Sequence, residues 1–190
     1  MRSEKRNKEE LERNINRKKN LIRQIRKDLA VKTMLTVGIF AFAFTFVFGV
    51  CFAPTNDMFP AVHKGDLIIY YRLGGFINSD IVIYETDDGI CKGRNIGRIA
   101  ATESDVVDRT DGGLLKINGN IQPVQKRAGL FYRTFVREGG GLRYPSEVPP
   151  GAYLVLGDER EDAEDSRDHG YIHKDRIKGK VFTVIRRRPV

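Results

Sequence analysis

One long apolar stretch dominates the first third of the chain. Residues 33–53 carry no charged side chain over 21 positions. As a helix this stretch would be about 31 Å long, close to the roughly 20 residues that a bilayer core requires. A buried helix of a soluble protein usually keeps a polar side, and this stretch has none. The pattern predicts a transmembrane anchor over residues 33–53.

The residues before this stretch predict a charged amphipathic helix. Apolar side chains recur at spacings of 4, 7, 3 and 4, with Lys18 at the vacant heptad position. Such a stripe can pair with another helix, lie on a membrane surface, or belong to a solvated helix that merely extends the anchor. The sequence leaves these three open. The stripe consists of Leu11, Ile15, Ile22, Ile25 and Leu29.

After the anchor, short runs of branched and aromatic residues alternate with turn signals. Asn118-Gly119 is the clearest of these, because this pair favours a tight hairpin turn. The expected fold is mainly β, a barrel or a sandwich, in one domain over residues 54–190 with a small insertion at about 122–148. Strands are predicted at residues 67–71, 81–84, 114–117, 153–156 and 181–185.

The charge is unevenly distributed along the chain. The formal net charge is +8; residues 1–32 hold 12 Lys or Arg against 5 Asp or Glu, and the remaining residues hold 21 against 20. This basic excess abuts the apolar stretch, so membrane topology explains it more simply than nucleic-acid binding. Positive flanks stay in the cytoplasm. We therefore expect a single-pass protein of the cell membrane with a cytoplasmic basic helix over residues 1–32, an extracytoplasmic domain and no nucleic-acid partner.

A cleaved signal peptide is the rival interpretation of the N-terminal region. Both the basic region and the apolar segment are longer than in a typical signal peptide. Pro54 would follow a cut after Ala53, where a proline ring suits an extended substrate poorly. An uncleaved anchor is the better interpretation. Cys51 and Cys91 could pair, but two thiols make no disulfide framework, so two free thiols are expected.

Ordered motifs after the anchor resemble those of type I signal peptidases. Met58-Phe59-Pro60 followed by Gly65-Asp66 is similar to Ser-Met-x-Pro and Gly-Asp, with Asp57 in place of the serine. Residues 79–84 resemble the family's Gly-Asp-Ile-Val-Val-Phe strand. Residues 95–105 resemble the lysine-bearing segment, with Gly97 in place of the lysine.

Two further motifs complete the resemblance. Asp111-Gly112 and residues 117–119 resemble the Asp-Gly and Ile-Asn-Gly hairpin. Residues 157–170 resemble the segment that runs from Gly-Asp-Asn to Ser-x-Asp-Ser-Arg, with Ala163 in place of its first serine. The resemblance implies a signal-peptidase-like β-fold whose rim rests on the outer membrane face. The basic helix before the anchor is not part of it.

Active members of this family use a serine nucleophile activated by a neutral lysine, and an oxyanion hole. Asp57 would place negative charge where an oxyanion develops, and Gly97 has no side chain to act as a base. Ala163 lacks the hydroxyl that would orient a lysine, while Thr55 keeps a hydroxyl at an oxyanion-hole position of some relatives. The resemblance therefore implies no catalytic residues at the dyad positions.

The resemblance also implies a groove that takes an extended segment by β-addition. Its expected walls are Thr55, Asp57, Met58, Pro60, Ile81, Val82, Ile83 and Tyr84. Structural roles are expected for Gly65, Asp66, Arg98, Gly157, Asp158, Asp165, Ser166 and Arg167, with Asp165 either paired with Arg167 or capping backbone N–H groups. No cofactor is expected, and no metal, since His63, His169 and His173 show no ligand spacing.

Replacement chemistry remains open at two places: a Cys91–Lys92 pair, and an aspartic dyad of Asp57 with Asp158 or Asp165. Three functions follow. The favoured one is a non-catalytic protein that binds segments of secreted proteins, similar to accessory factors or chaperones of pilus assembly in Gram-positive bacteria, whose partners are pilin precursors or a sortase. The alternatives are an active signal peptidase with displaced groups, and a membrane-tethered module that acts through its inner helix. The oligomeric state stays undetermined.

Overall fold

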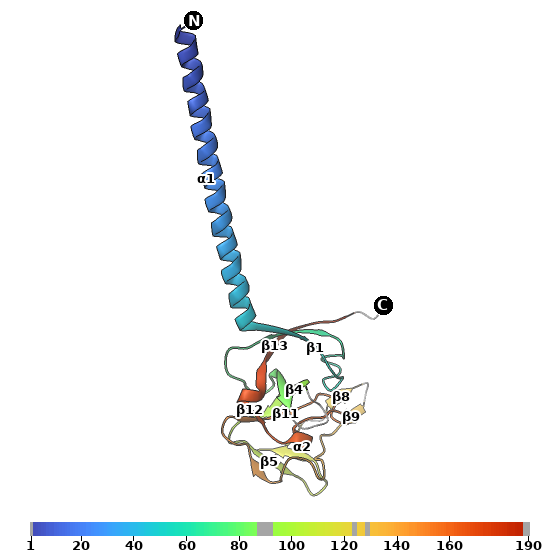
Figure 1. Cartoon of the computed structure of the whole chain (residues 1–190). Coiled ribbons are helices and arrows are strands. Elements are labelled where there is room, and N and C mark those ends of the chain that lie inside the picture. The colour runs from blue at the N-terminus through green and yellow to red at the C-terminus, as the bar shows by residue number, and fades with distance from the viewer. Residues whose placement is uncertain (1, 87–92, 123–124, 128–129, 188–190) are drawn as a thin grey trace. The chain divides into compact units, whose positions relative to one another are not determined.

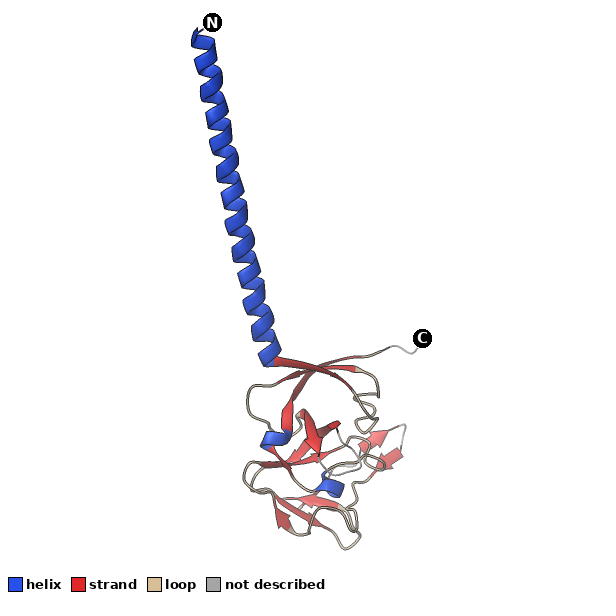
Figure 2. Cartoon of the chain, viewed as in Figure 1, coloured by secondary structure: helices blue, strands red, loops and turns tan. Residues whose placement is uncertain are grey.

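The computed structural model describes residues 2–86, 93–122, 125–127 and 130–187. The chain divides into two compact units, Met1–Phe46 and Val47–Val190. The first is almost entirely one helix and the second is built mostly of strands (Figure 2). The predicted mainly β fold, preceded by one long apolar helix that could cross a membrane, is thus confirmed.

The first unit consists of α1 (Arg2–Val47), which runs without interruption (Figure 1). Within the described residues it is the one helix long and apolar enough to cross a membrane. The hydroxyls of Thr33, Thr36 and Thr45 donate to the carbonyls four residues earlier, at 2.9, 2.9 and 2.8 Å. These bonds satisfy the hydroxyls within the helix, so α1 can present this surface to lipid without an unpaired polar group.

The predicted anchor is wrong at its C-terminal end. Helix α1 stops at Val47, and the next five residues form strand β1 (Phe48–Phe52) of the main sheet. Gly49 permits this because the Tyr70 ring packs directly against its backbone, where a side chain would collide. The charge-free part of α1 is therefore residues 33–47, about 22 Å long, and a span of about 28 Å would have to reach back past Lys32 to about Leu29.

The main sheet of the second unit has seven strands in the order β1-β2-β13-β3-β4-β11-β12. All neighbouring pairs are antiparallel. The strands that follow β1 are β2 (Leu67–Tyr71), β3 (Ile81–Thr86), β4 (Gly93–Ala101), β11 (Ala152–Leu156), β12 (Ile172–His173) and β13 (Ile177–Ile185).

A four-stranded sheet, in the order β10-β5-β6-β7, and a β8-β9 ribbon complete the second unit. The hairpin predicted at Asn118-Gly119 is confirmed: both residues have positive φ, and Ile117 pairs with Asn120. The remaining elements are β5 (Val106–Arg109), β6 (Leu115–Ile117), β7 (Asn120–Ile121), β8 (Gln125–Arg127), β9 (Leu130–Tyr132), β10 (Ser146–Glu147), α2 (Ser166–His169) and η1 (Lys174–Arg176).

Both faces of the centre of the main sheet are buried. On one face, Met58 and Ile83 pack with Ile96; on the other, Tyr84 packs with Val155. Strands β3 and β4 lie between these two clusters, which explains why the run Ile81–Tyr84 is apolar without interruption. All five predicted strand positions fall in strands, although the structure adds β4 and β5, which lack a continuous apolar run.

Candidate functional site

The loop between β1 and β2 carries Asp57, the position at which the resemblance implies a serine nucleophile in active relatives. Met58, fully buried in the core, and the hydrogen bond from Val62 N to Met58 O (2.9 Å) fix the residues that follow Asp57. Asp66 closes the loop by accepting a hydrogen bond from His63 N at 2.9 Å. Asp57 thus sits on a firmly packed turn, next to a side chain that the core holds in place.

The carboxylate of Asp57 is half-buried and already hydrogen-bonded. Thr55 Oγ1 donates to Asp57 Oδ2 at 2.6 Å. Burial raises the pKa of Asp57, and the nearby charges of Glu164 and Asp165 add to this, whereas the bond from Thr55 and the charge of Arg137 oppose it. The Thr55 hydroxyl directs its proton to this carboxylate, so it does not serve as a free oxyanion donor. The site offers an acceptor where an active peptidase needs a donor.

Gly97, where the resemblance implies a lysine base in active relatives, is closely packed by neighbouring residues. Gly97 is buried in β4, and a Cβ atom added there would lie 2.5 Å from Val155 Cγ1 and 3.4 Å from both Tyr84 Cε1 and Leu156 O. Real Cβ atoms do not approach other atoms as closely as 2.5 Å, so Val155 would have to move. A side chain at Gly97 would therefore require Val155 to shift.

The backbone of Leu156 and Gly157 connects the two dyad positions. The carbonyl of Leu156 is next to Gly97, and a Cβ atom added to Gly157 would be 2.8 Å from Asp57 O. Asp57 O also accepts a hydrogen bond from Glu159 N at 2.8 Å. The structure thus brings the Asp57 turn and β4 to the same place, on either side of the end of β11.

Ala163 packs against Gly157 from the other side. Its methyl group would collide with any side chain on Gly157, and its own surface is fully buried. Arg137, from the insertion, donates to Ala163 O at 2.6 Å and to Asp168 Oδ1 at 2.7 Å. Sequence reasoning missed Arg137, since an isolated arginine in an insertion gives no signal of the loop that it holds.

Two ion pairs support this region. Arg98 Nε and Nη2 donate to the two carboxylate oxygens of Asp158 at 2.9 and 2.7 Å. These bonds raise the pKa of the Arg98 guanidinium above its ordinary value. Asp165 and Arg167, exposed by only 1% and 2%, form a second bidentate pair at 2.9 and 2.8 Å.

Asp165 also caps backbone N–H groups, the second role expected for it from the sequence. Its carboxylate accepts hydrogen bonds from Gly157 N and Arg167 N, both at 3.0 Å, and it caps α2 reciprocally with Asp168. Ser166 Oγ accepts from Val155 N at 2.9 Å. An Asp165 committed to these bonds has no freedom to form an aspartic dyad with Asp57, and Asp158 is committed to Arg98.

The predicted binding wall at Ile81–Tyr84 is wrong. Strand β3 pairs with β13 on one edge and with β4 on the other, so it has no backbone edge to offer. Val82, Ile83 and Tyr84 are also buried in the core. This strand was predicted as a binding wall, but its apolar run indicates burial and does not identify an unpaired edge.

The open edge belongs to β4 instead. Strand β11 pairs with β4 only from Ala101 to Arg98, and no described strand pairs with this edge over Gly93–Gly97. Ile99 N and O bond toward residues 79 and 80 on the β3 side. Since backbone groups alternate along a strand, Arg94 and Ile96 direct their N–H and C=O groups to the side away from β3; Arg94 is exposed there, whereas Ile96 is buried, with 1% of its surface exposed.

Some predicted features lie outside the described residues or outside this site. Cys91 and Lys92 fall in the undescribed segment 87–92, so neither their pairing nor a link to Cys51 is described. Cys51 lies in β1 as a free thiol. Among the described residues, no group of three or more His, Cys, Asp or Glu side chains is arranged to hold a metal ion.

The family is now decided by comparison. A family model described as signal peptidase, peptidase S26, matches residues 26–185, more than half of the chain. The chain belongs to this family. Residues 1–25 lie outside the match.

Similar proteins include both peptidases and proteins named inactive. They are a probable signal peptidase I-2 of Synechocystis sp. (29% identical, covering 80% of this chain and 69% of that protein), a signal peptidase I of Leptolyngbya laminosa (27%, 86% and 78%) and an inactive signal peptidase IA of Staphylococcus aureus (28%, 80% and 86%). A crystal structure of a signal peptidase I from Enterococcus faecalis V583 matches 58% of this chain and 99% of that chain at 24% identity, with a TM-score of 0.42.

Filling the space at Gly97 should destabilise this S26 protein. We expect Gly97→Ala to lower the free energy of unfolding by about 1–3 kcal/mol, because the new methyl group displaces Val155. Val155→Ala should reduce this penalty, with a coupling of about 0.5–3 kcal/mol in a double-mutant cycle followed by chemical denaturation. Gly93→Ala is the matched control, since nothing lies within 4 Å of its added Cβ in the same strand. Equal effects at both glycines would contradict the packing argument.

The raised pKa of Asp57 predicts a pH-dependent stability. The folded protein holds this proton more tightly than the unfolded chain, whose Asp titrates at about 3.9. The contribution of Asp57 to wild-type stability should therefore fall as pH rises from that value through the folded-state pKa. Asp57→Asn removes this loss, so its stability relative to wild type should increase over the same range and then level off. Urea unfolding of the full chain in micelles measures this, and a difference that shrinks with rising pH would refute it.

Proposed function

We propose that this chain is a membrane-anchored, non-catalytic member of the S26 family that binds an extended polypeptide segment. The observation that carries the proposal is the filled site at Gly97: the base is absent and its space is occupied by Val155. Asp57 replaces the nucleophile with an acceptor of the wrong charge. The supporting ion pairs and backbone contacts around both positions are nevertheless present.

The free edge of β4 is the proposed binding surface. A segment added there would continue along β4 from the point where β11 ends at Leu156, and would meet the outward N–H and C=O groups of Arg94, which is exposed. The turn with Thr55 and Asp57 lies beside the end of β11, because the backbone of Gly157 is close to Asp57 O. Backbone pairing would supply affinity, and the carboxylate of Asp57 would accept a hydrogen bond from the bound chain.

Membership of the S26 family favours a secreted or surface polypeptide as the ligand. In the proposed role the protein holds such a segment without cutting it, as an accessory factor or chaperone. A pilin precursor is the first ligand to test, and a sortase would be the enzyme that acts on it next.

Crosslinking and cleavage together test this function. A photoreactive residue at Arg94 in the full chain in nanodiscs should capture a labelled pilin-precursor segment, whereas the same residue at Val106, 44% exposed in the other sheet, should not. N-methylation of the segment at alternate residues should abolish capture in one register only, since only one set of N–H groups faces β4. The precursor should stay intact. Turnover that Asp57→Ala removes would overturn the proposal, as would equal capture at both positions.

The outer domain also offers a surface for the membrane. One face of β1 carries the side chains at alternate positions, Phe48, Val50 and Phe52. Val50 and Phe52 are 51% and 67% exposed. Phe182 of β13, 70% exposed, lies with its ring 5.8 Å from that of Phe48. We place this aromatic face on the outer leaflet, with the basic N-terminal part of α1 in the cytoplasm.

Lipid-borne quenchers test the placement of this face. In a background with Cys51→Ser and Cys91→Ser, fluorophores on Phe52→Cys and Phe182→Cys should be quenched by nitroxide lipids in nanodiscs. The control, Val106→Cys, should not be quenched. Quenching of equal strength at all three positions, or at none, would show that the face does not rest on lipid.

A further inference from the structure

A continuous apolar stripe runs along the part of α1 that lies mostly before the family match. Ile15, Ile22, Ile25 and Leu29 follow spacings of 7, 3 and 4, so they share one side of the helix. Their exposed fractions are 42%, 55%, 56% and 63%, so no part of the chain that the structure describes covers them. A stripe of this kind on a helix normally packs against another element.

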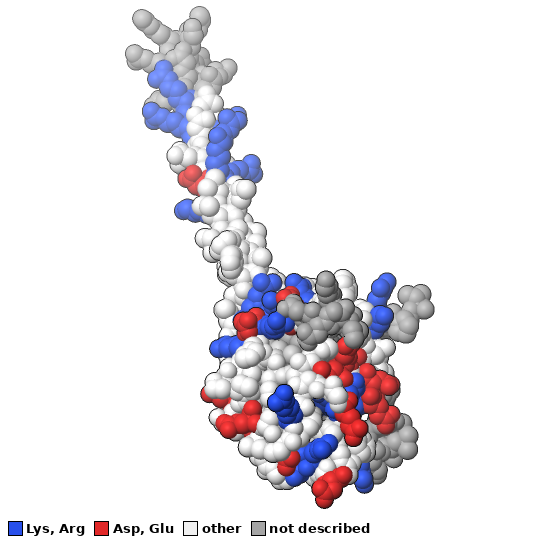
Figure 3. Space-filling model, turned by 60° about the horizontal axis from the view of Figure 1, so that its bottom comes forward, with Lys and Arg blue, Asp and Glu red and all other residues white. Residues whose placement is uncertain are grey.

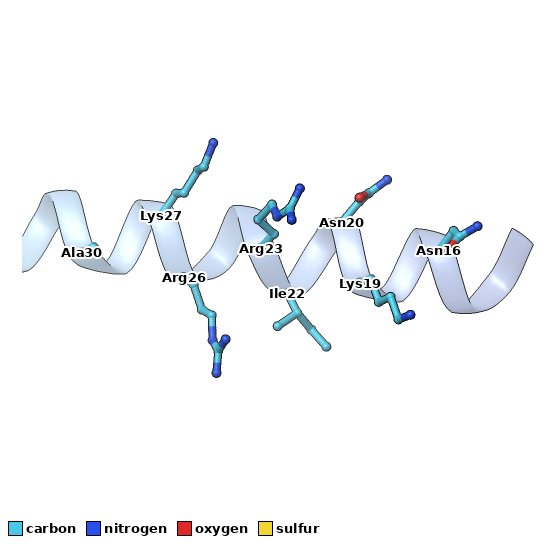
Figure 4. A pocket seen from close by; sticks show the side chains of 8 residues that line it. All are labelled: Asn16, Lys19, Asn20, Ile22, Arg23, Arg26, Lys27 and Ala30. Atoms are coloured by element: carbon cyan, nitrogen blue, oxygen red, sulfur yellow. The ribbon is translucent and has the colours of Figure 1, made fainter. Parts of the chain in front are cut away.

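The stripe is surrounded by positive charge. Residues 13–32 hold eight Lys or Arg against one acidic residue, Asp28. Figure 4 shows Lys19 and Arg26 projecting to the same side of the helix as Ile22. Basic side chains gather along this part of α1, while its apolar part shows none (Figure 3). A partner that covers the stripe must therefore tolerate or complement cations at its edges.

Lipid reaches only the end of the stripe nearest the span, at Leu29. If the span begins at about Leu29, Ile22 lies about 10 Å and Ile15 about 21 Å farther along the axis. The headgroup layer is only about 5–7 Å thick on each side. At the average tilt of about 20°, the span lengthens to about 21 residues and begins at about Lys27, and Ile15 remains about 17 Å out. Because α1 runs without a break, the stripe projects beyond the headgroups.

A second copy of the chain is also a poor partner. In a parallel pair, Lys18 would face Lys18 at a core position. In an antiparallel pair centred on the stripe, Lys19 would face Arg26. Asp28 is the one acid available in this region to offset these repulsions. Charge complementarity instead favours a partner that brings acidic residues.

We infer that the stripe Ile15–Leu29 docks an acidic amphipathic helix of another protein. Apolar residues of that helix would cover Ile15, Ile22 and Ile25, and its Asp or Glu side chains would flank them beside Lys19 and Arg26. The inference is independent of the β4 edge and goes beyond the proposed function. It gives the chain a second docking surface, on the other side of the membrane from the peptide-binding edge.

A designed helix pair tests this docking surface. The probe is a four-heptad peptide with Ile and Leu at the core positions and Glu at the flanking positions; its counterpart carries Lys in place of Glu. The full chain in nanodiscs of zwitterionic lipid should bind the acidic peptide, more weakly at high salt, and should not bind the basic one. Ile22→Ser with Ile25→Ser should weaken binding at least about tenfold. Asn20→Ser with Gln24→Ser, on the opposite side of α1, should leave it unchanged.

Three results would overturn the inference. The first is equal binding of both peptides, or of neither. The second is a disulfide-linked homodimer formed by Ile22→Cys, which would assign the stripe to a second copy. The third is a spin label at Ile22→Cys that reports a lipid environment in anionic nanodiscs, which would assign the stripe to the membrane.

Discussion

The buried pair of Asp165 and Arg167 organises the region on which both dyad positions depend. Its carboxylate holds the backbone of Gly157 and caps α2, while Arg167 Nη1 donates to Phe135 O and Arg160 O. Two charges so fully removed from water are tolerated because nearly every donor and acceptor is satisfied. Breaking such a pair typically costs about 3–5 kcal/mol, since one charge remains buried without compensation. This interaction makes Gly157 the fixed point between Asp57 and Gly97.

The substitutions at Asp57 and Gly97 are local, and the ion pairs around them are present. Removing the nucleophile or base of a serine protease can cost about 10⁶ in turnover, and losing both costs about the same because they act together. At Gly97 the loss goes further than one absent amine, because Val155 has taken the space. Restoring serine and lysine at the two positions would therefore also require room at Val155. A fold that keeps these ion pairs while Val155 packs against Gly97 favours the proposal that the protein binds a polypeptide without cleaving it.

Local signals in the sequence predicted part of this arrangement. The Asn118-Gly119 hairpin and the five apolar strand positions depend on neighbouring residues, so they could be predicted. The end of α1 could not be predicted, because the same charge-free run contains both the last turns of the helix and strand β1, and the absence of charge does not distinguish them. The open edge of β4 and the contact of Val155 with Gly97 depend on which strands pair in space. An apolar run such as Ile81–Tyr84 indicates burial, and for that reason it predicted the wrong wall.

The end of α1 at Val47 affects the proposed docking surface on α1, the stripe Ile15–Leu29. Since β1 belongs to the sheet, a membrane span in α1 would not use residues 48–52, and a span of about 28 Å would reach back to about Leu29 and include Lys32. The start of β1 therefore limits how much of α1 is available to cross a membrane, and with it how much of the stripe lies before the span.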